Sequence, residues 1–140
     1  MTRCLAFFSA LCIFLSLTAC GNKSKTVSKA AIAEPRNVVE VFFDYFSKPD
    51  YETMKAYCTE ECVDTYFHKG DVFGMITAKS TNIEEEPKSL SENECAVFVS
   101  VEMVTAKSSA LYGETETCFF VLLNKTAENT WLINGFATGI

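Results

Sequence analysis

Apolar residues recur every three or four positions from Pro35 to about Gly70, and every second position after Gly70. The first spacing is that of an amphipathic helix, and the second is that of a strand with one buried face. The change of period predicts a helical half followed by a sheet within residues 35–140. The chain therefore belongs to the α+β class.

Turn residues divide the helical half into three helices. The first begins at Pro35, whose missing N–H costs nothing at the first helical position, and it ends before Pro49. A second, short helix follows Asp50, whose side chain can cap the first turn. Thr59 caps a third helix, which is predicted to run to Gly70 as its left-handed terminating residue.

Four segments with alternating apolar side chains predict the strands. Short polar loops join these segments, and such short returns connect antiparallel neighbours. We therefore predict three N-terminal helices packed on a curved, four-stranded antiparallel sheet. The predicted strands are Met75 to Ile83, Cys95 to Val104, Glu116 to Leu123, and Trp131 to Ala137.

The two central predicted strands carry apolar residues on both faces. One face can cover the helices, but the other needs a pocket, a partner or a second copy of the chain, because soluble monomers rarely leave large apolar patches open. A homodimer through the sheet is one expectation. The residues of this second face are Phe98, Val104, Phe120 and Leu122.

A different pattern occupies the start of the chain. A short, positively charged beginning leads into an apolar run from Cys4 to Leu17, and small residues follow it. This is the layout of an export signal. The run is shorter than the roughly 20 residues of a membrane-spanning helix, so a single-pass anchor is the weaker interpretation. Polar residues without an apolar period follow Cys20 and predict a flexible tether.

The end of the apolar run, Leu17-Thr18-Ala19-Cys20-Gly21, resembles the lipobox of bacterial lipoproteins. This resemblance implies that the Cys20 thiol carries diacylglycerol and that the preceding residues are removed. It places the chain at the extracytoplasmic face of the cell membrane, where two acyl chains anchor stably. The predicted organisation is a signal peptide over 1–19, a lipidated tether over 20–34 and a folded domain over 35–140.

Charge limits the partners of the domain. The chain has 18 acidic and 12 basic residues and a net charge of −6. Nucleic-acid binding relies on cations that displace phosphate counterions, so nucleic acid is a poor match. We expect contact with the membrane through the lipid, an apolar small molecule or a protein as the partner, and no cofactor.

Four cysteines lie beyond Cys20, and an exported domain can form disulfides from them in three pairings. Cys58 and Cys62 are expected one helical turn apart, where a bond would strain the helix. Cys95 and Cys118 fall in successive strands, and a bond between them competes with burial of each as a small hydrophobe. The spacing does not match a zinc site, and no metal is expected.

Candidate catalytic side chains are few. Asp44 lies on the polar stripe of the first helix, where a solvated carboxylate is the simpler interpretation. His68, the only histidine, falls at the predicted end of the third helix and either pairs with Asp64 or complements the helix dipole. Tyr66 and Trp131 complete the candidate pocket residues, although such aromatics are usually core. No Ser–His–Asp set is evident, which favours a non-catalytic domain.

The order of three helices and a curved meander resembles the cone-shaped fold shared by nuclear transport factor 2, ketosteroid isomerase and the polyketide cyclases. The segments Val38–Phe43 and Asp50–Met54 are similar to the opening of that fold. The segments Cys58–Cys62 and Tyr66–Met75 resemble a group of uncharacterised lipoproteins of Gram-positive bacteria with the same fold. The resemblance implies an internal pocket between helices and sheet, but no particular activity.

These patterns favour a lipid-anchored extracytoplasmic module that binds a small apolar ligand or a protein without catalysis. Two other functions stay open. One is a cone-fold enzyme, such as an isomerase or dehydratase, that acts on a small hydrophobic substrate. The other is a structural module that dimerises through its sheet. A buried Asp or His that converges on an open pocket would favour the enzyme over the binding module, whereas the structural module predicts a stable dimer with no ligand cavity.

Overall fold

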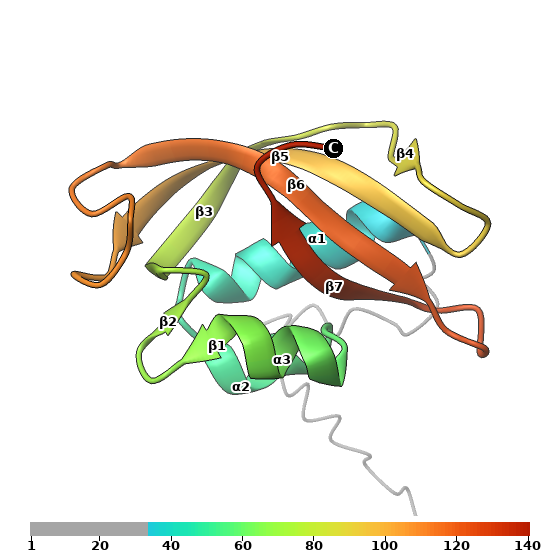
Figure 1. Cartoon of the computed structure of the whole chain (residues 1–140), viewed down its shortest axis with the longest axis horizontal. Coiled ribbons are helices and arrows are strands. Elements are labelled where there is room, and N and C mark those ends of the chain that lie inside the picture. The colour runs from blue at the N-terminus through green and yellow to red at the C-terminus, as the bar shows by residue number, and fades with distance from the viewer. Residues whose placement is uncertain (1–33) are drawn as a thin grey trace, which may run out of the picture.

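Residues 34–140 form an α+β arrangement in the computed structural model of the chain, and the structure describes these residues. Three helices come first, and a curled antiparallel sheet bends around the longest of them like half a barrel (Figure 1). The predicted signal peptide and Cys20 lie outside the described residues. None of the helices between residues 34 and 140 is long and apolar enough to cross a membrane.

Both short helices begin at the caps that the sequence predicts. The Asp50 carboxylate accepts a hydrogen bond from the N–H of Thr53 at 3.2 Å. The Thr59 hydroxyl accepts one from the N–H of Cys62 at 3.1 Å. Each cap satisfies a backbone donor that the first helical turn leaves without a partner. The helices are α1 (Pro35–Phe46), α2 (Tyr51–Lys55) and α3 (Glu60–Tyr66).

Helix α3 ends earlier than predicted. Phe67 already has extended backbone, with φ −90° and ψ 108°, so the helix stops at Tyr66. Gly70, with φ 100°, lies in the turn of a hairpin and does not terminate the helix. A glycine with positive φ serves a helix end and a hairpin turn equally well, so its presence does not distinguish the two.

The sheet has seven strands where four were predicted. They are β1 (Phe67–His68), β2 (Asp71–Val72), β3 (Met75–Ile83), β4 (Lys88–Ser89), β5 (Glu94–Thr105), β6 (Glu116–Lys125) and β7 (Trp131–Ala137). The four long strands correspond to the predicted ones and pair antiparallel in chain order. The three additional strands have two residues each, which is too short to show an alternating pattern.

The concave face of the sheet bends around α1 (Figure 1), and aromatic rings fill the space between them. Phe42, Phe43 and Phe46 of α1 are fully buried, and their ring centroids lie 5.4–6.2 Å apart. Phe136 and Phe119 of the sheet approach these rings to 6.0 and 6.3 Å. Such pairs add about 0.5–1.5 kcal/mol each beyond the area that they bury. Side chains therefore occupy the interior where the resemblance to the cone fold implies a pocket.

The opposite face of the sheet is also apolar, as the pattern of the central strands predicts. Phe98 and Phe120 lie directly opposite each other on β5 and β6, and their rings meet edge to face at 5.2 Å. Both are half-buried, and Val104 further along β5 is exposed. The homodimer expected from this face stays a prediction.

The strand register separates Cys95 from Cys118. Cys95 lies opposite Leu123 and Cys118 lies opposite Ser100, which puts the two cysteines five residues apart along the strands. They also differ in burial, since Cys95 is buried and Cys118 is exposed. Five residues of strand cover about 17 Å, whereas a disulfide needs Cα atoms within about 7 Å. A bond between Cys95 and Cys118, one of the two alternatives that the sequence left open, is incompatible with this register.

Candidate functional site

A pocket of about 640 Å³ lies where the β1–β2 hairpin, the β2–β3 turn and the β5–β6 loop meet. Its walls are mostly apolar, and two ionisable side chains join them. Other concavities between residues 34 and 140, of about 400–490 Å³, have walls that are divided about evenly between polar and apolar atoms. The lining residues of the large pocket are His68, Asp71, Phe73, Gly74, Ser108, Ser109, Ala110, Leu111 and Thr138.

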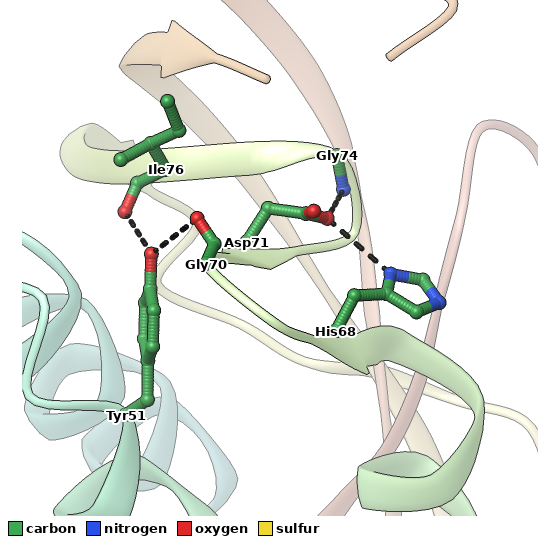
Figure 2. A network of polar contacts seen from close by, with 6 residues as sticks. All are labelled: Tyr51, His68, Gly70, Asp71, Gly74 and Ile76. Atoms are coloured by element: carbon green, nitrogen blue, oxygen red, sulfur yellow. Dashed lines mark hydrogen bonds and ion pairs between the residues drawn. The ribbon is translucent and has the colours of Figure 1, made fainter. Parts of the chain in front are cut away.

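The ionisable side chains of the pocket form a pair (Figure 2). The Nδ1 atom of His68 lies 3.3 Å from Oδ1 of Asp71, and the same oxygen accepts a hydrogen bond from the N–H of Gly74 at 3.0 Å. The side chain of Asp71 is 12% exposed and that of His68 is 61% exposed. The turn thus fixes the carboxylate, and the carboxylate holds one ring nitrogen of an accessible histidine. In Figure 2 the second ring nitrogen points away from the turn.

The partner of His68 differs from the predicted one. Because α3 stops at Tyr66, His68 lies in β1 and is paired with Asp71 of β2. Neither alternative given by the sequence holds, because His68 shares no helix with Asp64 and does not lie in the last turn of α3. Sequence reasoning missed that only two residues separate His68 from Asp71. The second of these residues is a glycine, which is typical of a tight turn.

Tyr51 attaches this hairpin to α2. Its hydroxyl oxygen lies 2.6 Å from the carbonyl oxygen of Ile76 and 3.1 Å from that of Gly70 (Figure 2). Burial and, to a smaller extent, the negative charge of Asp71 raise the pKa of Tyr51, so the hydroxyl keeps its proton. That single proton serves both carbonyl groups, which lie on either side of β2. Sequence reasoning did not identify Tyr51 as a site residue.

The β2–β3 turn has left-handed backbone at both of its residues. Phe73 has φ 52° and Gly74 has φ 76°. This is the pattern of a two-residue hairpin turn, in which a bulky first residue is uncommon. The Phe73 ring stacks on Phe136 at 5.1 Å and meets Phe119 at 5.6 Å. Ring burial offsets the backbone strain, and the ring forms the inner wall of the pocket.

The β5–β6 loop forms the opposite wall of the pocket. A Cβ atom at Gly74 would lie 2.7 Å from the Oγ of Ser109, so the loop and the β2–β3 turn are closely packed and position 74 requires glycine. The same Oγ accepts a hydrogen bond from the N–H of Leu111 at 3.2 Å. Ser109 and His68 line one pocket, but no hydrogen bond joins them in the described residues.

Tyr66 borders the pocket from inside the fold. Its ring meets that of Phe73 at 5.6 Å, and it packs across β7 at Gly135. A Cβ atom at Gly135 would come within 3.3 Å of the Tyr66 ring and hydroxyl. Tyr66 is therefore part of the core that supports Phe73, and it is not among the residues that line the pocket.

The structure does not bring the other two predicted pocket residues to this place. Asp44 is exposed on α1. Trp131 begins β7, where its ring lies 5.7 Å from the ammonium group of Lys125. Trp131 lines a separate concavity of about 400 Å³, together with Glu34 and Pro35 at the beginning of the described chain.

The beginning of the described chain and the β5–β6 loop, which lines the 640 Å³ pocket, lie at opposite ends of the sheet (Figure 1). The concavity beside Glu34 includes Glu94, the first residue of β5, whereas the loop that lines the pocket follows Thr105, the last residue of β5. A strand of this length spans about 35–40 Å. The described chain thus begins at one end of the sheet, and the pocket lies at the other end.

No three His, Cys, Asp or Glu side chains come together as metal ligands between residues 34 and 140. Comparison with the models of known protein families finds no match for this chain, and comparison with curated proteins finds none either.

Proposed function

We propose that this protein is a lipid-anchored extracytoplasmic module that binds a small, mostly apolar ligand in the pocket beside His68 and Asp71. The pocket itself supports this proposal most directly. Ligand sites combine predominantly apolar walls with a few fixed polar groups in about 300–1,000 Å³. The pocket has such walls, one fixed His–Asp pair and a volume of about 640 Å³.

The chemistry of the pair defines the ligand further. When His68 donates its Nδ1–H to Asp71, the neutral ring presents Nε2 as a hydrogen-bond acceptor. A ligand hydroxyl or N–H group matches this acceptor, while Phe73 and Leu111 contact the apolar body. The preferred ligand is therefore an apolar molecule with one hydroxyl or amine group at its end.

The probe 2-naphthol, which has an aromatic body and one hydroxyl group, tests this site by calorimetric titration of the full chain in detergent. Leu111 lines the pocket and Leu90 does not, and the two are 41% and 46% exposed. We expect saturable binding to the wild type, loss of binding in Leu111→Asp and unchanged binding in Leu90→Asp. The methyl ether of the probe should bind about tenfold more weakly, because it lacks the donated hydrogen bond. Equal affinity in both leucine variants would contradict the proposal.

The anchor is tested separately. The lipobox resemblance supports lipidation of Cys20, which lies outside the described residues. Metabolic labelling with a fatty-acid probe should mark the wild type and a Cys12→Ala control, and it should not mark Cys20→Ala. Equal labelling of both variants, or no labelling of the wild type, would contradict lipid anchoring. The proposed ligand binding in the pocket would not be affected by that result.

We further infer that the domain is a variant of the cone fold of nuclear transport factor 2, as in the group of lipoproteins that its sequence resembles. The order of elements supports this inference, since three helices precede a curled antiparallel sheet that bends around α1. In this variant, aromatic side chains fill the interior and the pocket lies at one end of the sheet.

A catalytic role at the same pocket is the second candidate. A histidine oriented by a carboxylate can activate a nucleophile, and Ser108 and Ser109 line the same pocket. This function predicts hydrolysis of p-nitrophenyl butyrate that falls at least tenfold in His68→Gln and is unchanged in Asp44→Asn. Indistinguishable rates in the wild type and His68→Gln would exclude it for ester substrates.

A further inference from the structure

Cys58 and Cys62 are the pair of cysteines that the fold brings together. Cys58 lies between α2 and α3, one residue before the cap Thr59, and Cys62 lies in the first turn of α3. Both are buried in the same core cluster. The side chain that precedes a helix cap commonly packs against the fourth helical residue, which is Val63 here, directly after Cys62.

The side chains of Cys58 and Cys62 interact with each other. A hydrogen bond between Cys58 and Cys62, followed by burial, raises the pKa of the Cys58 thiol. The Cys58 Sγ atom also lies 3.6 Å from the carbonyl oxygen of Met54. In the reduced protein the Cys58 thiol therefore keeps its proton, and the core encloses both side chains.

The structure removes the objection that the sequence raises against a bond between these residues. With both cysteines on one helix, the bond would strain helical geometry. Cys58 instead forms an isolated bridge with Ile133 of β7. The N–H of Thr59 donates to the Ile133 carbonyl, and the N–H of Ile133 donates to the Tyr57 carbonyl, both at 2.8 Å. Cys58 thus lies outside α3, in the turn after α2 where its own N–H donates to the Lys55 carbonyl at 3.1 Å, and the two cysteines do not share one helix.

We propose that Cys58 and Cys62 are a modification site at which an intrachain disulfide forms by exchange with an external disulfide, such as oxidised glutathione. The thiolate of one cysteine attacks the external disulfide and displaces one thiolate. The second cysteine then attacks the mixed disulfide and displaces the other thiolate. The protein loses two protons and two electrons and gains one S–S bond, while the external disulfide is reduced to two thiols.

Burial determines when this exchange occurs. A disulfide exchange needs an exposed thiolate, and both side chains are buried in the folded protein. The bond therefore forms in the unfolded or partly folded chain, where so short a loop closes readily. Folding then encloses the S–S bond in the core and protects it from reductants, so the disulfide stabilises the junction between α2 and α3.

Peptide mapping tests the bond directly. The full chain in detergent is refolded in mixtures of oxidised and reduced glutathione, alkylated with iodoacetamide and digested with trypsin. Trypsin cleaves after Lys55 and after Lys69 and so releases one peptide that contains both Cys58 and Cys62. Every other cysteine falls in a different peptide. We expect this peptide to be unalkylated and lighter than its reduced form by two hydrogen atoms.

Thermal unfolding supplies the second measurement. Closing this short loop should raise the melting temperature of the oxidised protein by about 5 °C over the reduced protein. The difference should persist in the Cys95→Ser/Cys118→Ser variant and vanish in Cys58→Ser/Cys62→Ser. The first variant keeps the proposed pair intact, so the test stands even if the second variant does not fold.

Two results would overturn the proposal. One is a peptide 56–69 that carries two alkyl groups at every ratio of oxidised to reduced glutathione. The other is a set of cross-linked peptides that join Cys58 or Cys62 to Cys95 or Cys118. Neither result depends on ligand binding, so the outcome is independent of the proposed function.

Discussion

Phe73 combines a core ring with a strained turn backbone, and two substitutions separate these effects. Phe73→Ala removes a ring that stacks on Phe136 at 5.1 Å and meets Phe119 and Tyr66 at 5.6 Å. A Phe→Ala change in a full core costs about 3–5 kcal/mol. Because Phe73 is half-buried, we expect the free energy of unfolding to fall by less, about 2–3 kcal/mol.

Phe73→Gly removes the same ring and also relieves the backbone. At φ 52°, a residue other than glycine carries about 1–2 kcal/mol of strain. The greater freedom of glycine in the unfolded chain offsets part of that gain. We therefore expect the glycine variant to be about 1 kcal/mol more stable than the alanine variant, which reverses the usual order of these residues.

Urea unfolding followed by circular dichroism measures both variants, with linear extrapolation at equal slope. Tyr112→Ala removes an aromatic ring that is 61% exposed, and as the control it should change stability by less than about 0.5 kcal/mol. An alanine variant as stable as the glycine variant would refute the left-handed turn. A loss below about 1 kcal/mol in both variants would refute the place of the ring in the core.

Three further predictions concern other contacts. Tyr51→Phe removes the hydroxyl that bonds two backbone carbonyls and should lower the free energy of unfolding by about 1 kcal/mol in urea; no change would contradict the attachment of the hairpin to α2. Gly135→Ala places a Cβ atom 3.3 Å from the Tyr66 ring and should cost about 1 kcal/mol, visible as a lower melting temperature; an unchanged melting temperature would contradict this close packing. Burial raises the pKa of Cys95 from 9.0 to about 11, so the folded state holds the thiol proton more tightly than the unfolded state. This contribution to stability is complete below pH 9 and is lost as the pH rises toward about 11. Over that interval the free energy of unfolding of the wild type should fall by about 1–2 kcal/mol more than that of Cys95→Ala. Parallel pH profiles of the two proteins would refute the shift in the pKa of Cys95.

Sequence periodicity predicted the parts of the fold in which one element buries a long face. The alternation along β5 continues for most of its length, because every second side chain meets the core. The cap residues Asp50 and Thr59 act on donors within three positions, so local sequence is enough to identify them. The strands β1, β2 and β4 have two residues each and show no period of their own.

The candidate site was predicted only in part, because its arrangement depends on where α3 stops. His68 was recognised as a candidate, but its partner Asp71 comes from a hairpin whose turn glycine also fits a helix end. The contact that holds the hairpin joins Tyr51 to carbonyl groups 19 and 25 positions away. No local pattern encodes such a contact, and only the folded chain shows it.

The position of Glu34 has a consequence for access to the His68 pocket. The residues that precede Glu34 join the domain at the end of the sheet opposite to the pocket. If the proposed lipid on Cys20 holds the protein at a bilayer, the length of β5, about 35–40 Å, separates the point of attachment from the mouth of the pocket. The proposed anchor therefore leaves the mouth of the pocket unobstructed.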